Sequence, residues 1–189
     1  MRRPHRFQAS ARSLLDNEDR MRRQPPQTIL DRTDLSPGQV WADIGCGVGY
    51  FTIPLREAGA KVVAIDAQRE MLESLTSRAK DMEGICLVQF DMPPLPLLGS
   101  KIDRALMVNV LHEVEDRKLL SSEVSRILRP GGHLIVVDFQ KGETPHGPPA
   151  WERLSPEEAC SIFDDLTLVS RHDEEEYYQL DLRFGRDPS

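Results

Sequence analysis

The chain has 189 residues, of which 39% are hydrophobic and 29% charged, a composition that fits one globular domain and excludes collagen-like and wholly disordered proteins. Its net charge is −7. Residues 1–23 carry seven arginines against three acids, which leaves the remainder of the chain strongly acidic, so we expect no nucleic-acid partner. Three widely spaced cysteines predict neither a disulfide framework nor a zinc site. No apolar stretch has the length of a membrane span and no hydrophobic leader follows the basic start, so we expect a cytoplasmic protein without a membrane partner.

The first 34 residues are predicted to form an N-terminal helical segment that acts as a lid or forms part of the acceptor side. Residues 10–24 are polar and favour a helix, a Pro25-Pro26 pair follows, and residues 28–33 form a second short helical pattern. A turn is predicted at 35–38. We expect the main domain to cover residues 35–189, without an internal repeat.

Apolar runs alternate with helical patterns after this turn, as is typical of a parallel α/β sheet. Strands are predicted over 39–44, 61–65, 85–90, 102–108 and 133–137. Helices are predicted between strands at 72–82 and 116–128. In the first of them one face carries Leu72, Leu75, Ala79 and Met82. That face is expected to pack on the sheet.

The C-terminal third is predicted to complete the sheet. Gly131 and Gly132 are expected to reverse the chain into the strand at 133–137, and residues 139–152 to form a long loop. Ser155 and Glu158 have the spacing of a capping box ahead of a short helix. The last two strands, at about 166–171 and 177–183, are expected to form a hairpin.

A glycine-rich loop follows the first predicted strand. Gly45, Gly47 and Gly49 let a ligand approach the backbone, and the amides of the following helix favour an anionic group such as a carboxylate. Asp66 ends the next strand, where its carboxylate can accept hydrogen bonds from two ribose hydroxyls. The loop and the acid together predict a nucleoside-containing ligand.

A nicotinamide dinucleotide is disfavoured as that ligand. Its fingerprint is Gly-x-Gly-x-x-Gly, whereas the third glycine comes one residue early here and Tyr50 follows it. Asp43, two residues before the first glycine, would repel a pyrophosphate. An ammonium group or a sulfonium would be attracted instead.

With these residues the sequence resembles the class I S-adenosylmethionine-dependent methyltransferases, in particular the branch similar to the ubiquinone and menaquinone biosynthesis enzymes. Residues 40–51 resemble the first motif of the family and residues 63–66 the acidic strand after it. Asp91, residues 102–103 and residues 128–134 resemble later motifs in the expected order.

The resemblance implies a Rossmann-like, doubly wound α/β fold. Its seven-stranded, mostly parallel sheet would have one antiparallel edge strand and helices on both faces. It also implies S-adenosyl-L-methionine as cofactor, S-adenosyl-L-homocysteine as product, and a small-molecule acceptor bound by the N-terminal segment and later loops. Residues 162–166 lack the Ala-Gly-Phe turn common in relatives, so the acceptor side departs from the family pattern.

The same resemblance implies the cofactor-binding residues. Those around the methionine moiety would be Asp43, Gly45, Cys46, Gly47 and Gly49. Those around the ribose and adenine would be Asp66, Ala67, Gln68, Asp91 and Met92. Those that close the pocket would be Asn109, Val110 and Leu111.

Methyl transfer from a sulfonium mainly requires alignment of the acceptor, and a base is needed only where the acceptor must lose a proton. His112, after the fourth strand, and Tyr50 are the candidate catalytic residues, although His112 in such a place can equally start a loop or cap a helix. Candidates for an acceptor pocket, which can equally be packing residues, are Tyr50, His146, Trp151, Tyr177 and Tyr178. No metal site is predicted, because residues 112–116 lack the second histidine of H-E-x-x-H.

Three functional hypotheses follow. The first is a methyltransferase that acts on an unidentified small molecule by in-line displacement. The alternative is a catalytically silent S-adenosylmethionine-binding subunit that supports a partner protein. A nicotinamide oxidoreductase is disfavoured by the glycine spacing. A monomer and a homodimer both stay open.

Overall fold

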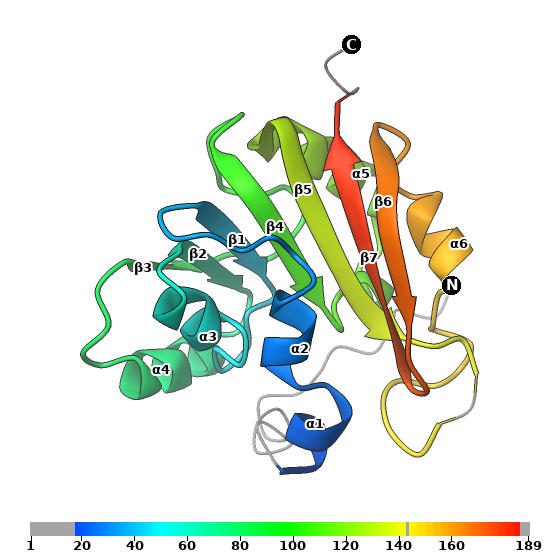
Figure 1. Cartoon of the computed structure of the whole chain (residues 1–189), viewed down its shortest axis with the longest axis horizontal. Coiled ribbons are helices and arrows are strands. Elements are labelled where there is room, and N and C mark those ends of the chain that lie inside the picture. Colours follow the sequence, from blue (N-terminus) through cyan, green and yellow to red (C-terminus); the bar gives the residue numbers. More distant parts are fainter. Residues whose placement is uncertain (1–17, 143, 186–189) are drawn as a thin grey trace. The chain divides into compact units, whose positions relative to one another are not determined.

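The computed structural model describes residues 18–142 and 144–185. They form two compact units, the first unit of residues 18–91 and the second unit of residues 92–142 and 144–185. Figure 1 labels their helices and strands. The described residues hold seven strands, the number that the sequence predicts. The part of the predicted N-terminal helix before residue 18 lies outside them.

The first unit contains three parallel strands in the order β3-β2-β1. They are β1 (Val40–Ile44), β2 (Lys61–Asp66) and β3 (Ile85–Gln89). Four of the five residues of β1 are buried, in keeping with a parallel strand that is covered on both faces. Ile44 pairs with Ile65, and Asp66 pairs with Gln89. The carboxyl ends of β1 and β2, which carry Asp43 and Asp66, therefore lie side by side.

Four helices belong to the first unit. They are α1 (Glu18–Arg23), α2 (Pro26–Leu30), α3 (Thr52–Glu57) and α4 (Arg69–Arg78). Helix α4 packs against β2 and β3 through Met71, Leu72 and Leu75. It ends earlier than the apolar spacing predicts, with Ala79 at its C-cap, because the chain turns there to enter β3.

The second unit contains four strands in the order β4-β5-β7-β6. They are β4 (Ile102–Val108), β5 (Leu128–Phe139), β6 (Leu166–Asp173) and β7 (Tyr177–Phe184). Strand β4 is parallel to β5, and β7 is antiparallel to both β5 and β6. The antiparallel strand therefore lies one position in from the edge strand β6. The predicted hairpin of the last two strands is confirmed.

Strand β5 begins five residues earlier than predicted. Leu128 already pairs with Ile102, and the register shifts before His133 pairs with Arg104. A Cβ atom on Gly132 would lie 2.9 Å from the carbonyl oxygen of Arg129. The two glycines therefore form an irregularity inside the strand instead of a turn ahead of it.

Three short helical elements complete the second unit. They are the 3-10 helix η2 (Leu111–Glu113), α5 (Arg117–Ile127) and α6 (Pro156–Cys160). Asp116 caps α5 by accepting a hydrogen bond from the Leu119 amide, and Ser155 with Glu158 forms the predicted capping box of α6. Figure 1 shows α6 beside the pair β6 and β7, and it contacts β7. None of the helices in the described part of the chain has the length and apolarity that a membrane span requires.

The glycine-rich loop packs directly on α4. Cys46, Ala64, Leu72 and Leu75 form one buried cluster. Gly49 has a φ of +85°, and a Cβ atom on it would lie 2.3 Å from a methyl carbon of Leu75. The closeness of loop and helix therefore requires glycine at this position.

We predict that Gly49→Ala lowers the free energy of unfolding by more than Gly38→Ala does. Gly38 has a φ of +86° with no atom near its Cβ position. Alanine there costs only the strain of a left-handed backbone conformation, about 1–2 kcal/mol. Gly49→Ala adds overpacking against Leu75, about 1–3 kcal/mol more. Urea unfolding of both variants measures the difference, and equal losses would show that Leu75 does not restrict the loop.

Candidate functional site

Hydrogen bonds tie the glycine-rich loop to the end of β2. The amides of Gly45 and Cys46 both donate to the carbonyl oxygen of Ile65, at 2.8 and 3.0 Å. The Gly47 amide donates to Oδ2 of Asp66 at 2.9 Å, and the Gly49 amide donates back to the carbonyl of Cys46. Most of the loop glycines and Asp66 are thus brought together, as the sequence predicts, but these amides are already bonded within the chain.

Asp66 is fixed at both carboxylate oxygens. Besides the Gly47 amide at Oδ2, the Gln68 amide donates to Oδ1 at 2.9 Å. The residue is only 8% exposed. A carboxylate offers about four acceptor positions, enough for these two amides and for two ribose hydroxyls. Ala67 lies between Asp66 and Gln68, and its carbonyl accepts from the Gln89 side chain at 3.4 Å.

Asp43 is buried behind the loop. Thr52, the first residue of α3, donates its hydroxyl to Oδ2 of Asp43 at 2.5 Å. Burial raises the pKa of Asp43 from 3.8 to about 6, with Asp66 adding to the shift while Thr52 and Arg20 oppose it. Thr52 is not among the site residues that the sequence predicts. Its position in the first turn of the helix after the loop is the signal that would have found it.

The Cys46 thiol lies in the same buried region. Burial, with the charges of Asp43 and Asp66, raises the pKa of this thiol far above its ordinary range. A thiol that stays protonated is a poor nucleophile. Cys46 therefore contributes its backbone amide and its volume to the loop.

Tyr50 holds helix α1 against the loop. It is 5% exposed, and its hydroxyl donates to the Gln24 carbonyl at 3.0 Å and contacts Sδ of Met21 at 3.1 Å. The guanidinium carbon of Arg20 lies 4.1 Å above the centre of the Tyr50 ring. These contacts give Tyr50, a candidate catalytic residue in the sequence, the role of an anchor for α1.

The remaining predicted cofactor residues are divided between the units. Asp91 follows β3 in the first unit and is exposed. Met92 opens the second unit, and Asn109, Val110 and Leu111 follow β4 there. The Asn109 amide donates to the carbonyl of Val137 at 2.8 Å, which holds the end of β4 to β5.

His112 forms a buried pair with Asp138. Its Nδ1 lies 2.7 Å from Oδ1 of Asp138, and its backbone amide donates to Oδ2 at 3.2 Å. The ring packs edge-on against Phe139, with ring centres 6.1 Å apart. Asp138 ends the apolar part of β5 as Asp66 ends β2, so the rule that found Asp66 would have found it as well.

The pKa of His112 lies above its ordinary value of 6.5. Burial lowers this pKa, but the Asp138 carboxylate raises it through its charge and its hydrogen bond, and Glu113 and Glu152 add to the rise. Oε1 of Glu113 is 3.9 Å from Nε2. A carboxylate on Nδ1 fixes the ring orientation and leaves Nε2 to exchange a proton.

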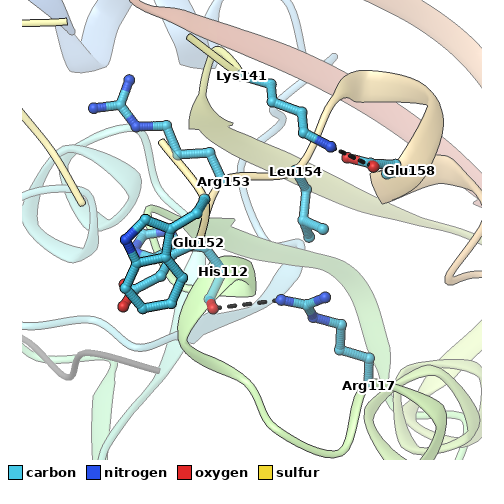
Figure 2. Close-up of a pocket in the computed structure, with 8 residues that line it drawn as sticks. His112, Arg117, Lys141, Glu152, Arg153, Leu154 and Glu158 are labelled. Atoms are coloured by element: carbon cyan, nitrogen blue, oxygen red, sulfur yellow. Dashed lines mark hydrogen bonds and ion pairs between the residues drawn. The ribbon is translucent and has the colours of Figure 1, made fainter. Parts of the chain in front are cut away.

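His112 lines a cavity of about 240 Å³ in the second unit (Figure 2). The other residues around it are Arg117, Lys141, Trp151, Glu152, Arg153, Leu154 and Glu158. Figure 2 shows Lys141 paired with Glu158, and Arg117 donating to the carbonyl of His112. Of the aromatic acceptor-pocket candidates, Trp151 lines the cavity, whereas Tyr177 and Tyr178 are buried in β7.

Arg153 fixes the loop beside this cavity. Its guanidinium donates to the carbonyls of Gln140, Gly142, His146 and Pro148, at distances from 2.6 to 3.2 Å. His146 therefore contributes a backbone oxygen to the structure. Within residues 18–142 and 144–185, no group of three or more His, Cys, Asp and Glu side chains is placed to hold a metal ion.

We predict that Asp138→Asn lowers the pKa of His112, because the amide removes the charge that offsets burial. Glu113→Gln should lower it less, since that carboxylate is more distant from the ring. A pH titration of the His112 ring protons by nuclear magnetic resonance measures both shifts. A larger shift in the Glu113 variant would contradict the pairing.

The comparison with known sequences shows the family. A family model described as a methyltransferase domain matches residues 42–136, just over half of the chain. The chain belongs to this methyltransferase family. The prediction of a methyltransferase is confirmed at the level of the family, and S-adenosylmethionine, the predicted cofactor, is the one that the name of a similar solved structure gives.

Two curated relatives illustrate the range of the family. Malonyl-[acyl-carrier protein] O-methyltransferase of Serratia marcescens is 27% identical over 79% of this chain and 57% of its own length. Demethylmenaquinone methyltransferase of Staphylococcus saprophyticus is 28% identical over 62% of this chain and 52% of its own length. The chain thus spans about half the length of these relatives.

A solved structure shows the fold. The S-adenosylmethionine-dependent methyltransferase from Aquifex aeolicus is 23% identical, covers 95% of this chain and 100% of its own, and has a TM-score of 0.88. The predicted Rossmann-like class with seven mostly parallel strands is confirmed by this likeness.

Proposed function

We propose that the chain transfers a methyl group from S-adenosylmethionine to a small molecule with an ionisable hydroxyl, and that His112 is the general base. The observation that carries this proposal is the buried His112–Asp138 pair on the wall of a cavity. The net charge of −7 supports a small molecule over a nucleic acid as acceptor.

The first unit fits the cofactor. Asp66, held by two backbone amides, would accept the ribose hydroxyls. Asp43 gives the buried side of the loop a carboxylate that attracts the positive charges of the ligand. When bound, S-adenosylmethionine supplies a methyl group already activated on a sulfonium, so the chain's main task is to bind and orient both molecules.

The His112–Asp138 pair has the arrangement of a base and its positioning residue. Nδ1 donates to the Asp138 carboxylate in the neutral ring, so the lone pair of Nε2 is the one that can take a proton. The raised pKa of His112 makes the neutral ring a stronger base than an ordinary imidazole. A hydroxyl that loses its proton to Nε2 becomes a better nucleophile for the methyl group.

We predict that S-adenosylhomocysteine binds the chain and that Asp66→Asn weakens this binding about tenfold or more, because one carboxylate oxygen becomes an amide that cannot accept. Isothermal titration calorimetry measures both affinities. Asp81→Asn removes an exposed carboxylate of the same unit and serves as control. Absence of binding at millimolar ligand would refute the cofactor assignment, and equal affinity in the Asp66 variant would refute the ribose assignment.

We predict that His112→Gln lowers the rate of transfer to phenolic and other hydroxyl acceptors by about 10²–10⁴-fold and leaves S-adenosylhomocysteine affinity unchanged. The wild-type rate should fall as the pH drops through the pKa of His112, above 6.5, because the protonated ring cannot accept a proton. In Asp138→Asn the pH range over which the rate falls should move to lower pH. Rates measured with radiolabelled cofactor over pH 5–9 check both.

An unchanged rate in His112→Gln would exclude His112 as the base. Tight cofactor binding without transfer to any acceptor of the panel would instead support the silent cofactor-binding subunit. The panel should include amines as well as hydroxyl compounds, since an amine that is already neutral needs no base.

A further inference from the structure

The glycine-rich loop leaves one part of the proposed cofactor without an obvious partner. The methionine moiety carries an ammonium and a carboxylate. The sequence pattern assigns the carboxylate to backbone amides, but those of Gly45, Cys46, Gly47 and Gly49 all donate to acceptors within the chain. Helix α3 has six residues, and its Ile53 amide already donates to the carbonyl of Gly49.

We propose that Arg20 of helix α1 binds this carboxylate, with the Tyr50 ring as the platform that holds its guanidinium. The proposal rests on the proposed function, since it concerns the same cofactor. An arginine fork can bind a carboxylate through two parallel hydrogen bonds, which makes it the preferred side chain for such a group.

The position of Arg20 is set by a group of contacts at the loop. Its guanidinium stacks 4.1 Å from the centre of the Tyr50 ring, within the range of a cation–π interaction. Its Nε lies 3.4 Å from Oε1 of Gln24, whose backbone carbonyl accepts the Tyr50 hydroxyl. Gln24 and Tyr50 are both buried. The guanidinium is thus held directly beside the residue that ends the glycine-rich loop.

The charges around the loop match an amino-acid zwitterion. Arg20 is close enough to Asp43 to oppose the effect of burial on its pKa. Asp43 supplies a negative charge on the buried side of the loop, and Arg20 a positive charge on the side of α1. An α-amino acid presents its two charges on adjacent groups, so the ammonium would face Asp43 while the carboxylate meets Arg20.

Three ligands separate the carboxylate from the rest of the cofactor. S-adenosylhomocysteine carries both charged groups, its decarboxylated analogue keeps the amine alone, and methylthioadenosine carries neither. Calorimetric titration of the full chain with each ligand should give the tightest binding for S-adenosylhomocysteine. Arg20→Met should weaken that ligand by about tenfold to a hundredfold, the size of a charge-assisted pair, and change the other two by less than about twofold.

Arg22→Met is the matched control. Arg22 lies on the same helix and carries the same charge, but its side chain is 68% exposed and pairs with Asp19. This variant should bind all three ligands as the wild type does. Methylthioadenosine also reports in each titration whether the nucleoside site is folded.

The outcomes are distinct. Equal weakening of all three ligands in Arg20→Met would show that Arg20 only supports the fold of the site, and unchanged binding of S-adenosylhomocysteine would show that another group holds the carboxylate. Either result overturns the inference and leaves the proposed function intact. If the wild type binds none of the three, the proposed function itself fails.

Discussion

The carbonyl oxygen of Ile65 accepts two hydrogen bonds, from the amides of Gly45 and Cys46, and the geometry of the first unit depends on this junction. It draws the loop after β1 across the end of β2 and places the Gly47 amide on the Asp66 carboxylate. The same path brings Gly49 against Leu75 of α4. Backbone direction, acid position and helix packing are therefore set by one contact between two neighbouring strand ends.

Burial then sets the chemistry of the acids. Asp43 lies behind the junction, where loss of water raises its pKa to about 6. Asp138 is equally buried but has a histidine partner, and there the carboxylate raises the pKa of His112 instead. The same type of residue at the end of an apolar strand thus has a raised pKa of its own in the first unit and raises the pKa of a histidine in the second.

The sequence predicts the strands and Asp66 because these signals are local. Strand-forming runs and a strand-end acid can be recognised within a few residues, and a confirmed capping box such as that of Ser155 depends on a spacing of three. The start of β5 could not be predicted, because it depends on the pairing of Leu128 with a strand far back in the chain.

The partners of the site residues were harder to predict for the same reason. Thr52, Asp138 and Arg20 acquire their roles from contacts that cross 9, 26 and 30 residues. Loop amides likewise donate hydrogen bonds to acceptors on the neighbouring strand β2. A glycine pattern therefore indicates the place of a ligand site more reliably than it indicates the groups that bind the ligand.

Arg153 lines the cavity of the second unit and holds the loop beside it. Its hydrogen bonds to the loop go to backbone carbonyl oxygens. Every residue type carries such an oxygen. These four bonds therefore do not depend on the side chains of the residues that accept them. A change of the His146 side chain, for example, would leave the bond between its carbonyl and the buried Arg153 in place, so this position can vary without loss of the tether.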